Sequence, residues 1–116
     1  KKNLNNLNKA EKAIKLIKSN LVLKGSSTII ISHNKKVIVN NHSSPELAVI
    51  GSGDVLAGMI VSLISKNKMS PFIAACTSTW LHGDIARKFN KGLIAEDIVR
   101  GIPSALKRLK NARFTK

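Results

Sequence analysis

The chain has 116 residues, of which 43% are hydrophobic, so it is long enough for one domain with a core and too short for two. No run of about 18 apolar residues is present, and the Lys- and Asn-rich N-terminal stretch contains no apolar signal segment, so we expect no membrane span and no membrane partner. The single cysteine, Cys76, cannot form an internal disulfide and is typical of a cytoplasmic protein.

The formal net charge of +14 is a feature that nucleic-acid-binding proteins share. The lysines are spread over the whole chain, however, and aromatic residues make up 3% of it with no tyrosine. The sequence therefore offers no platform on which bases could stack, and it contains no nucleic-acid-binding motif. We expect no specific nucleic-acid partner, and a basic surface can equally attract an anionic nucleotide.

The first part of the chain predicts one helix and three short strands. Residues 3–19 have an amphipathic helical pattern, and its apolar face consists of Leu7, Ala10, Ile14 and Ile17. Residues 21–24, 28–32 and 37–39 are apolar runs of strand length, and the polar turn between the last two makes them a hairpin. His33 is predicted to be a solvated residue of that turn.

A glycine-rich turn lies between residues 40–50, which have no regular period, and a long apolar run. The turn is the Gly-Ser-Gly-Asp of residues 51–54, and the apolar pattern that follows predicts a mostly buried helix beginning at the turn. Free N–H groups and the positive end of the helix dipole meet there and can bind phosphate. The turn is not a P-loop, which needs Lys followed by Ser or Thr, and Leu56 excludes the dinucleotide fingerprint.

Asp54 is the acidic residue of this turn. A carboxylate beside bound phosphate is repelled by it, so an acid here suggests a function, and the obvious one is to accept a proton from a hydroxyl near the phosphate. Ser and Asp are also common helix caps. The residues by themselves leave the general base and the plain cap equally open.

The next segment predicts a helix with Pro71 in its first turn. Its predicted apolar face consists of Phe72, Ile73, Cys76 and Trp80, and the small residues that would permit close packing are Ala74, Ala75, Ser78 and Gly83. Asp84 is predicted to be a surface or capping acid.

A last helix is predicted to open with the acids of residues 95–97, which suit the helix dipole. Pro103 predicts a kink or a split in this helix, and residues 107–116 predict a basic tail that frays. The expected core face is Ile98, Ile102, Leu106 and Leu109. No His/Cys cluster has the spacing of metal ligands, so no metal-binding residue is predicted.

Six short segments form a specific combination, although each one alone is weak. They are Leu-Lys-Gly at 23–25 before a Ser/Thr stretch, Gly-Ser-Gly-Asp-Val-Leu-Ala-Gly at 51–58, Ser-Pro at 70–71, Leu-His-Gly at 81–83, Asp-Ile at 97–98 and Ile-Pro-Ser-Ala-Leu at 102–106. In this order they resemble the ADP-dependent NAD(P)H-hydrate dehydratases of the ribokinase-like superfamily, over about residues 21–109.

This resemblance implies an α/β fold that corresponds to the C-terminal part of a ribokinase-like domain. Helices would pack on a partial sheet with a β-hairpin near the N-terminus, and residues 1–116 would form a single partial domain. The first strands of the larger sheet have no counterpart here. We therefore expect a preceding part of a longer protein, or a complementing partner, to supply the rest, with a homo-oligomer as a further option.

The resemblance also implies ADP-dependent dehydration of hydrated NADH or NADPH (NADHX, NADPHX), a repair reaction. Asp54 would deprotonate the hydroxyl of the hydrated ring, and His82 would contact the same substrate. The amides of Gly51, Ser52 and Gly53 would hold the charge on the transferred phosphoryl group. ADP, with ATP as the alternative donor, would arrive with Mg²⁺ and lie beside Lys24, Gly25, Ser26, Ser27, Thr28 and Gly53.

The segment before the glycine turn departs from the family's pattern. Where the family usually has Thr-Gly-Asn-Pro-Gly-Met-Ala-Thr-Gly, residues 42–50 read His-Ser-Ser-Pro-Glu-Leu-Ala-Val-Ile, so three glycines are replaced and Glu46 adds a negative charge. Loss of glycine limits positive φ values. A non-catalytic nucleotide-binding remnant is therefore one alternative. A carbohydrate or vitamin kinase of the same superfamily, which leaves the phosphate on its product, is another.

Overall fold

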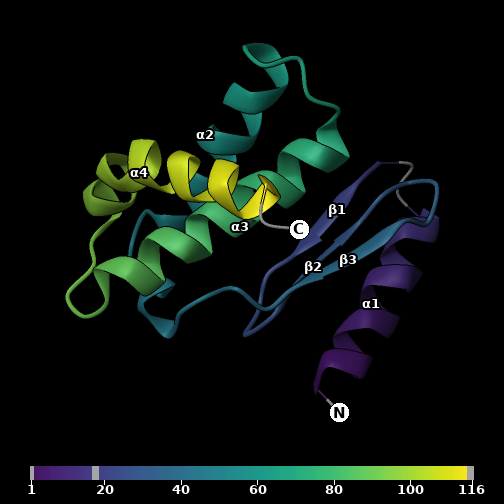
Figure 1. The fold of residues 1–116 in the computed structure, drawn as a ribbon. Coiled ribbons are helices and arrows are strands. Elements are labelled where there is room, and N and C mark those ends of the chain that lie inside the picture. The colour runs from purple at the N-terminus through teal and green to yellow at the C-terminus, as the bar shows by residue number, and fades with distance from the viewer. Residues whose placement is uncertain (1, 17–18, 115–116) are drawn as a thin grey trace.

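A three-stranded antiparallel sheet lies between the N-terminal helix on one side and the other three α-helices on the opposite side (Figure 1). The computed structural model describes the backbone of residues 2–16 and 19–114, and the side chains of residues 7–16 and 19–111. In chain order the elements are α1 (Lys2–Leu16), β1 (Leu21–Leu23), β2 (Thr28–Ile31), β3 (Val37–Asn40), the short 3-10 helix η1 (Pro45–Leu47), α2 (Ser52–Ser65), α3 (Pro71–Phe89) and α4 (Ala95–Phe114). The expected α/β class is confirmed.

The central strand of the sheet, β2, is buried on both faces. Its residues Ile29 and Ile31 pack under α1 against Ala10 and Ile14, and Ile30, on the opposite face, is 0% exposed where α3 covers the sheet. The hairpin predicted from the polar turn is confirmed, since β2 and β3 pair in the register Ile31↔Val37. Ile17, expected on the apolar face of α1, lies outside the described residues.

Helix α3 packs between the sheet and the helices α2 and α4. The small residues predicted to permit this packing, Ala74, Ala75, Ser78 and Gly83, are all buried. The larger face predicted for this helix was wrong, because Ile73 is 50% exposed and Phe72, Cys76 and Trp80 are only partly buried. A helix with neighbours on several sides presents its smallest side chains where the backbones come closest, so volume rather than hydrophobicity decides which face lies inside.

The other two helices also differ from the expectation. Helix α2 is not mostly buried, since its buried residues are Ser52, Leu56 and Met59 and Val61 is 63% exposed. In α4, Ala105 is fully buried while Leu106 is 43% exposed. The expected core face of α4 is confirmed at Ile98, Ile102 and Leu109 and was wrong at one position, because Ala105 rather than Leu106 lies in the core.

Helix α4 is neither split at Pro103 nor frayed from residue 107, since it continues to Phe114. Pro103 removes one backbone donor, but it is exposed, as is Val99 one turn before it. Water can therefore bind the Val99 carbonyl in place of the missing N–H, and the helix continues. Residues 115–116 of the predicted tail lie outside the described part of the chain.

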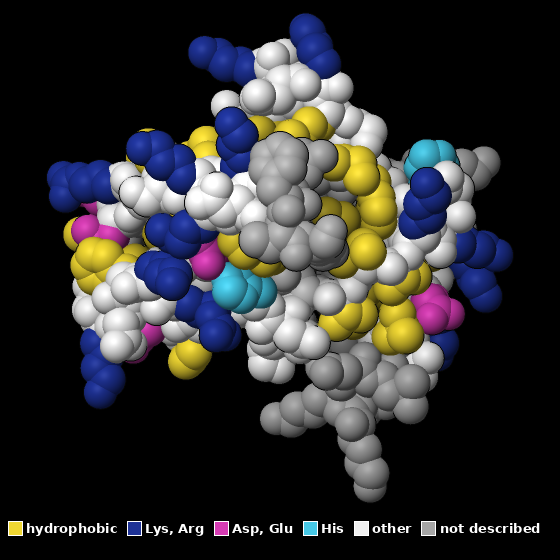
Figure 2. Space-filling view, in the orientation of Figure 1, with side chains coloured by type: hydrophobic (Ala, Val, Ile, Leu, Met, Phe, Trp, Pro, Cys, Tyr) yellow, Lys and Arg dark blue, Asp and Glu magenta, His cyan; other side chains and the backbone are white. Residues whose placement is uncertain are grey.

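None of the helices that the structure describes combines the length and apolar character that a membrane span needs. Figure 2 shows Lys and Arg side chains distributed over several parts of the face in view, at its left side, its top and its right edge. Positive charge is thus widespread on this face. A functional lysine has to be identified from its surroundings rather than from its charge.

Gly83 is the residue of α3 that permits the loop after β3 to lie directly on the helix. A Cβ atom at Gly83 would stand 1.7 Å from the backbone oxygen of His42 and 2.8 Å from its carbonyl carbon. These are backbone atoms and cannot turn aside as a flexible side chain can. The segment that begins at His42 is therefore in contact with the backbone of α3.

Gly83→Ala should destabilise the protein, because the helix and the loop would have to separate. We expect a loss of about 2–3 kcal/mol in the free energy of unfolding, at the upper end of the usual cost of overpacking. The matched control is Gly58→Ala in α2, where no atom lies within 4 Å of an added Cβ. This control should gain about 0.5–1 kcal/mol, because alanine is the better helix former. Urea unfolding measures both changes, and a Gly83→Ala protein as stable as wild type would contradict the contact.

Candidate active site

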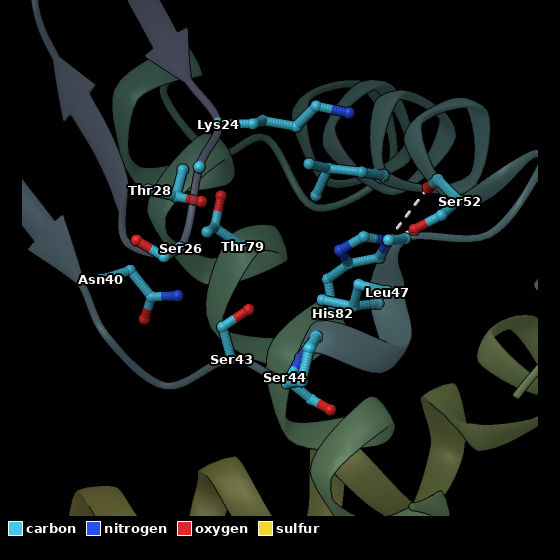
Figure 3. A pocket seen from close by; sticks show the side chains of 14 residues that line it. Lys24, Ser26, Thr28, Asn40, Ser43, Ser44, Leu47, Ser52, Thr79 and His82 are labelled. Atoms are coloured by element: carbon cyan, nitrogen blue, oxygen red, sulfur yellow. Dashed lines mark hydrogen bonds between the residues drawn. The ribbon is translucent and has the colours of Figure 1, made fainter. Parts of the chain in front are cut away.

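A cavity of about 630 Å³ lies where the end of β1, the loop after β3, the start of α2 and the middle of α3 meet (Figure 3). Of the residues predicted for the site, it brings together Lys24, Gly25, Ser26, Thr28, Ser52 and His82. The other lining residues are Asn40, Ser43, Ser44, Pro45, Leu47, Ala48, Leu56 and Thr79. Segments far apart in the chain therefore contribute polar and apolar side chains to one cavity.

The first turn of α2 has backbone donors that the protein does not use. Gly51 precedes the helix with a φ of 88°, in the left-handed region, and no side chain caps the helix. The amide of Ser52 donates to the Val49 carbonyl at 3.2 Å, and that of Val55 donates to Gly51 at 3.1 Å. For the amides of Gly53 and Asp54, the described residues provide no acceptor. Two N–H groups at the positive end of the helix are thus available to an anion.

The ammonium group of Lys24 lies directly over this turn. A Cβ atom built on Gly53 would stand 2.7 Å from Lys24 Nζ, so the glycine leaves the space that the lysine occupies. Lys24 extends from the end of β1 toward α2 across the top of the cavity in Figure 3. A cation beside the positive end of a helix is unfavourable by itself. An anion that contacts both would remove that repulsion.

His82 connects α3 to the start of α2 from inside the cavity. It is 5% exposed, and its Nε2 lies 3.0 Å from the Ser52 carbonyl and 3.1 Å from Ser52 Oγ. Because a carbonyl only accepts, Nε2 carries the proton and donates it to Ser52. In Figure 3 the other ring nitrogen is turned away from Ser52, toward the cavity. Neutral His82 therefore offers one hydrogen-bond acceptor to a ligand.

The surroundings of His82 favour this neutral form. Burial lowers the pKa of the imidazole, and the positive charge of Lys24 lowers it further, against the opposing effect of the hydrogen bond to the Ser52 backbone. Desolvation disfavours the charged ring, and a neighbouring cation does the same. The cavity therefore contains a lysine cation and an uncharged histidine.

Asp54 is the third residue of α2, and it is exposed rather than part of the cavity lining. It forms no ion pair with Lys24 within the part of the chain that the structure describes. Gly51 and Gly53 belong to the same turn outside the lining, and Ser27, also outside it, donates its hydroxyl to Asn41 Oδ1. Asp54 therefore lies at the protein surface in the first turn of α2, outside the cavity lining.

The cavity wall formed by residues 43–48 was missed in the sequence, which showed only an irregular loop. Ser44 Oγ accepts the amide of Glu46 at 3.2 Å and caps η1, with Pro45 in its first turn. A Ser-Pro pair of this kind is a helix-start signal that could have been recognised. Glu46, expected to bring a negative charge to the phosphate, is not among the lining residues. Thr79, three residues before His82, could have been found from helical spacing.

The stability of the protein should decrease on mild acidification because of His82. Its pKa in the folded state lies below the ordinary value of about 6.5, so below about pH 6.5 the unfolded chain binds more protons than the folded one. The contribution of neutral, buried His82 to the free energy of unfolding is complete above about pH 6.5, and it is lost as the pH falls toward the pKa of His82 in the folded state. Asp84 does not interfere, because its pKa is lowered from an ordinary value near 4.

We expect the melting temperature of the wild type to fall between about pH 7.5 and pH 5.5, the range in which histidines titrate, and His82→Gln to make this fall smaller. Gln retains a neutral donor for Ser52 but does not titrate. His33→Gln is the control, because His33 is exposed in the hairpin turn, and it should leave the slope unchanged. An equal slope in wild type and His82→Gln would mean that His82 is not held neutral by the fold.

Comparisons with known proteins identify relatives of this chain. The chain is 40% identical over 98 residues to an ADP-dependent (S)-NAD(P)H-hydrate dehydratase of Neisseria meningitidis, covering 83% of this chain and 32% of that protein. It is 40% identical over 84 residues to the bifunctional NAD(P)H-hydrate repair enzyme Nnr of Helicobacter pylori, covering 71% of this chain and 18% of that protein. The chain thus spans a third or less of the length of these relatives.

A solved structure with a similar fold is the ADP/ATP-dependent NAD(P)H-hydrate dehydratase from Bacillus subtilis, co-crystallised with ATP and Mg²⁺ and soaked with CoA. The TM-score is 0.78 at 29% identity, covering 85% of this chain and 38% of that chain. In addition, a sequence model of the NAD(P)H-hydrate dehydratase family matches residues 1–103. From this match over most of its length, the chain belongs to the NAD(P)H-hydrate dehydratase family.

Proposed function

We propose that the cavity binds the phosphates of ADP and serves the ADP-dependent dehydration of hydrated NADH or NADPH. The observation that carries this proposal is the Lys24 ammonium over the unused amides of Gly53 and Asp54. Phosphate is the ligand that such a combination of a cation and a helix N-terminus accepts best. Family membership supports the choice of ADP, because the relative from Neisseria meningitidis is named as an ADP-dependent dehydratase.

The segment after β1 would hold the rest of the nucleotide. Gly25, Ser26 and Thr28 line the cavity beside Lys24 and offer backbone and hydroxyl donors. Ser27 is adjacent and could exchange its bond to Asn41 for one to the nucleotide. ATP as an alternative donor, and Mg²⁺ bound with it, are supported by the crystals of the Bacillus subtilis enzyme. The described residues contain no cluster of three or more His, Cys, Asp or Glu, so we assign this chain no metal ligand.

In the proposed reaction, Asp54 takes the proton from the hydroxyl of the hydrated nicotinamide ring. The oxygen then attacks the terminal phosphorus of ADP, and AMP leaves. The amides of Gly51 and Gly53, together with Lys24, stabilise the charge on the transferred phosphoryl group, whereas the predicted Ser52 amide is already bonded to the Val49 carbonyl. Inorganic phosphate then leaves one ring carbon while the neighbouring ring carbon releases a proton to water, and the electrons of that C–H bond form the double bond. Neutral His82 would accept a hydrogen bond from the substrate through its unused nitrogen.

We further propose that turnover needs a part of the family's fold that this chain does not span. The chain corresponds to 32% of the Neisseria meningitidis enzyme, and one side of α2 is exposed where a larger domain could cover it. A preceding protein segment or a second copy could supply this part. The proposed location is the cytoplasm, where free thiols such as that of Cys76 are stable.

Nucleotide binding without turnover is the second candidate. It is favoured by the exposure of Asp54 and by the loss of three glycines in residues 42–50. A small-molecule kinase of the same superfamily would share the first half of the chemistry and differ only in retaining phosphate on its product. An assay for phosphate release from a hydrated dinucleotide distinguishes the dehydratase from the nucleotide-binding protein and from the kinase.

Lys24→Gln should weaken ADP binding by about 10- to 100-fold, the usual value of a hydrogen bond to a charged group. Isothermal titration with Mg-ADP measures the affinity. The control is Lys36→Gln in the exposed hairpin turn, which makes the same change in net charge outside the cavity lining. If both variants bind ADP equally, the attraction is a property of the whole basic surface rather than of the cavity.

Asp54→Asn should lower kcat by about 10²- to 10⁴-fold, the usual contribution of a general base. The measurement needs an active enzyme, such as a chimera in which this chain replaces the matching part of the Neisseria meningitidis dehydratase. ADP affinity should hold or increase, because a negative charge near phosphate is removed. The melting temperature should change little, because Asp54 is exposed and its side chain does not cap the helix. Wild-type turnover in Asp54→Asn would remove Asp54 from the mechanism.

A further inference from the structure

A cluster of charged and aromatic side chains lies on the side of α3 away from the cavity. The carboxylate of Asp84 contacts His42 Nε2 with Oδ1 at 2.7 Å and accepts a hydrogen bond from Arg108 Nε with Oδ2 at 2.6 Å. The ring of His42 also stacks on Trp80, with centroids 4.7 Å apart and planes 10° from parallel. We call His42, Trp80, Asp84 and Arg108 the anchor cluster.

Asp84, predicted to be a surface or capping acid, is 3% exposed. Burial alone would raise its pKa, but the hydrogen bonds and charges of His42 and Arg108 lower it below the ordinary value. The carboxylate is therefore ionised, with a partner on each oxygen. Removing one partner of a buried charge is costly, because the remaining charge stays desolvated. The hydrogen bonds of Asp84 to His42 and Arg108 are therefore costly to break.

The anchor cluster joins three elements that are distant in sequence. Trp80 and Asp84 belong to α3, Arg108 belongs to α4, and His42 is the second residue after β3. Together with the backbone contact at Gly83, they hold His42 by its main chain, its ring nitrogen and its ring face. The residues that follow immediately, Ser43 to Ala48, include five that line the cavity.

This attachment explains how the cavity wall keeps its position without the glycines of the family pattern. The wall is also held by Leu47, which packs against the hydrophobic core. Its hydrogen bonds are local, such as the one from Asn40 Nδ2 to the His42 carbonyl at 3.3 Å and the Ser44 cap of η1. Such neutral bonds each contribute less than a bond to a buried charge.

We propose that the anchor cluster positions the cavity wall of residues 43–48, so that Arg108 of α4 controls the wall from outside the cavity. No residue of α4 lines the cavity, and Arg108 acts only through Asp84 and His42. The positioning of the wall is a property of the chain alone. Its consequence, that Arg108 sets the affinity for a nucleoside diphosphate, rests on the function proposed above.

The test compares Arg108→Ala with Arg100→Ala. Both arginines lie on α4 and both bind an acid, but Arg100 pairs with exposed Glu96 of its own helix at 3.4 Å. Both variants therefore replace an arginine of α4 by alanine and remove one positive charge. Only Arg108 is connected, through Asp84 and His42, to the cavity wall. The measurements are amide hydrogen exchange of peptides covering 41–49, emission of Trp80, which is the one tryptophan of the chain, and the Kd for Mg-ADP.

In Arg108→Ala we expect exchange in 41–49 to be about 10- to 100-fold faster, as for the loss of a hydrogen bond to a charged group. The emission of Trp80 should shift to longer wavelength as His42 leaves its ring, and the Kd for Mg-ADP should increase by about tenfold. Arg108→Lys should restore part of each change, because an ammonium keeps the charge beside Asp84. Arg100→Ala should behave as wild type in all three measurements.

Equal exchange of residues 41–49 in Arg108→Ala and Arg100→Ala would overturn the proposal. Faster exchange spread evenly over α3 and α4 would also count against it, because Arg108 would then stabilise the whole fold rather than position the wall. A wild-type chain that does not bind Mg-ADP would remove the proposed function and the consequence for affinity. The exchange and the emission of Trp80 would still decide whether the anchor cluster positions the wall.

Discussion

Helix α3 contacts the sheet, α2, α4 and η1, and this crowding is possible because its inner residues are small. Ala74, Ser78 and Ala86 are all 0% exposed, and Gly83 touches the backbone of the loop after β3. A helix packed in this way can neither rotate nor shift along its axis without overlaps. Its side chains on every face are therefore held in place, including those that belong to the candidate site.

The side chains on different faces of α3 have different surroundings and different roles. Thr79 and His82 face the cavity, Leu81 and Ile85 belong to the core, and Asp84 faces the loop and α4. Neighbouring positions along a helix point about 100° apart, which is why adjacent residues have such different surroundings. A single helix thus holds the neutral histidine, one side of the hydrophobic core and the buried carboxylate of the anchor cluster.

Charged side chains on opposite sides of α3 differ in whether the protein supplies a partner of opposite charge. In the anchor cluster, the carboxylate of Asp84 is fully partnered by His42 and Arg108, so its electrostatic interactions are complete within the protein. In the cavity, the Lys24 ammonium stands beside the positive end of α2, where the described residues provide no paired acid. A satisfied ion pair is typical of a structural role, whereas an unsatisfied concentration of positive potential is typical of an anion site.

The sequence by itself was sufficient for the features that depend on near neighbours. The periodicity of apolar residues predicted the four α-helices and the hairpin, although not the short helix η1, and the glycine turn predicted the start of α2. These features follow from hydrogen bonds and side chains within a few residues. The combination of short segments also identified the family that residues 1–103 match. Lys24, Ser52 and His82 were named from these segments and lie together on one cavity.

Only the tertiary structure decided which faces are buried and which distant residues meet. In the structure much of α2 is exposed, and Ala105 rather than the expected Leu106 lies in the core. Helix α4 is continuous through Pro103. The tertiary structure also showed that Asp54 is exposed outside the cavity lining and that Asp84, predicted to be a surface acid, is a buried partner of His42 and Arg108. Burial and ion pairing between residues 42, 84 and 108 depend on how helices pack, and no local pattern encodes that packing.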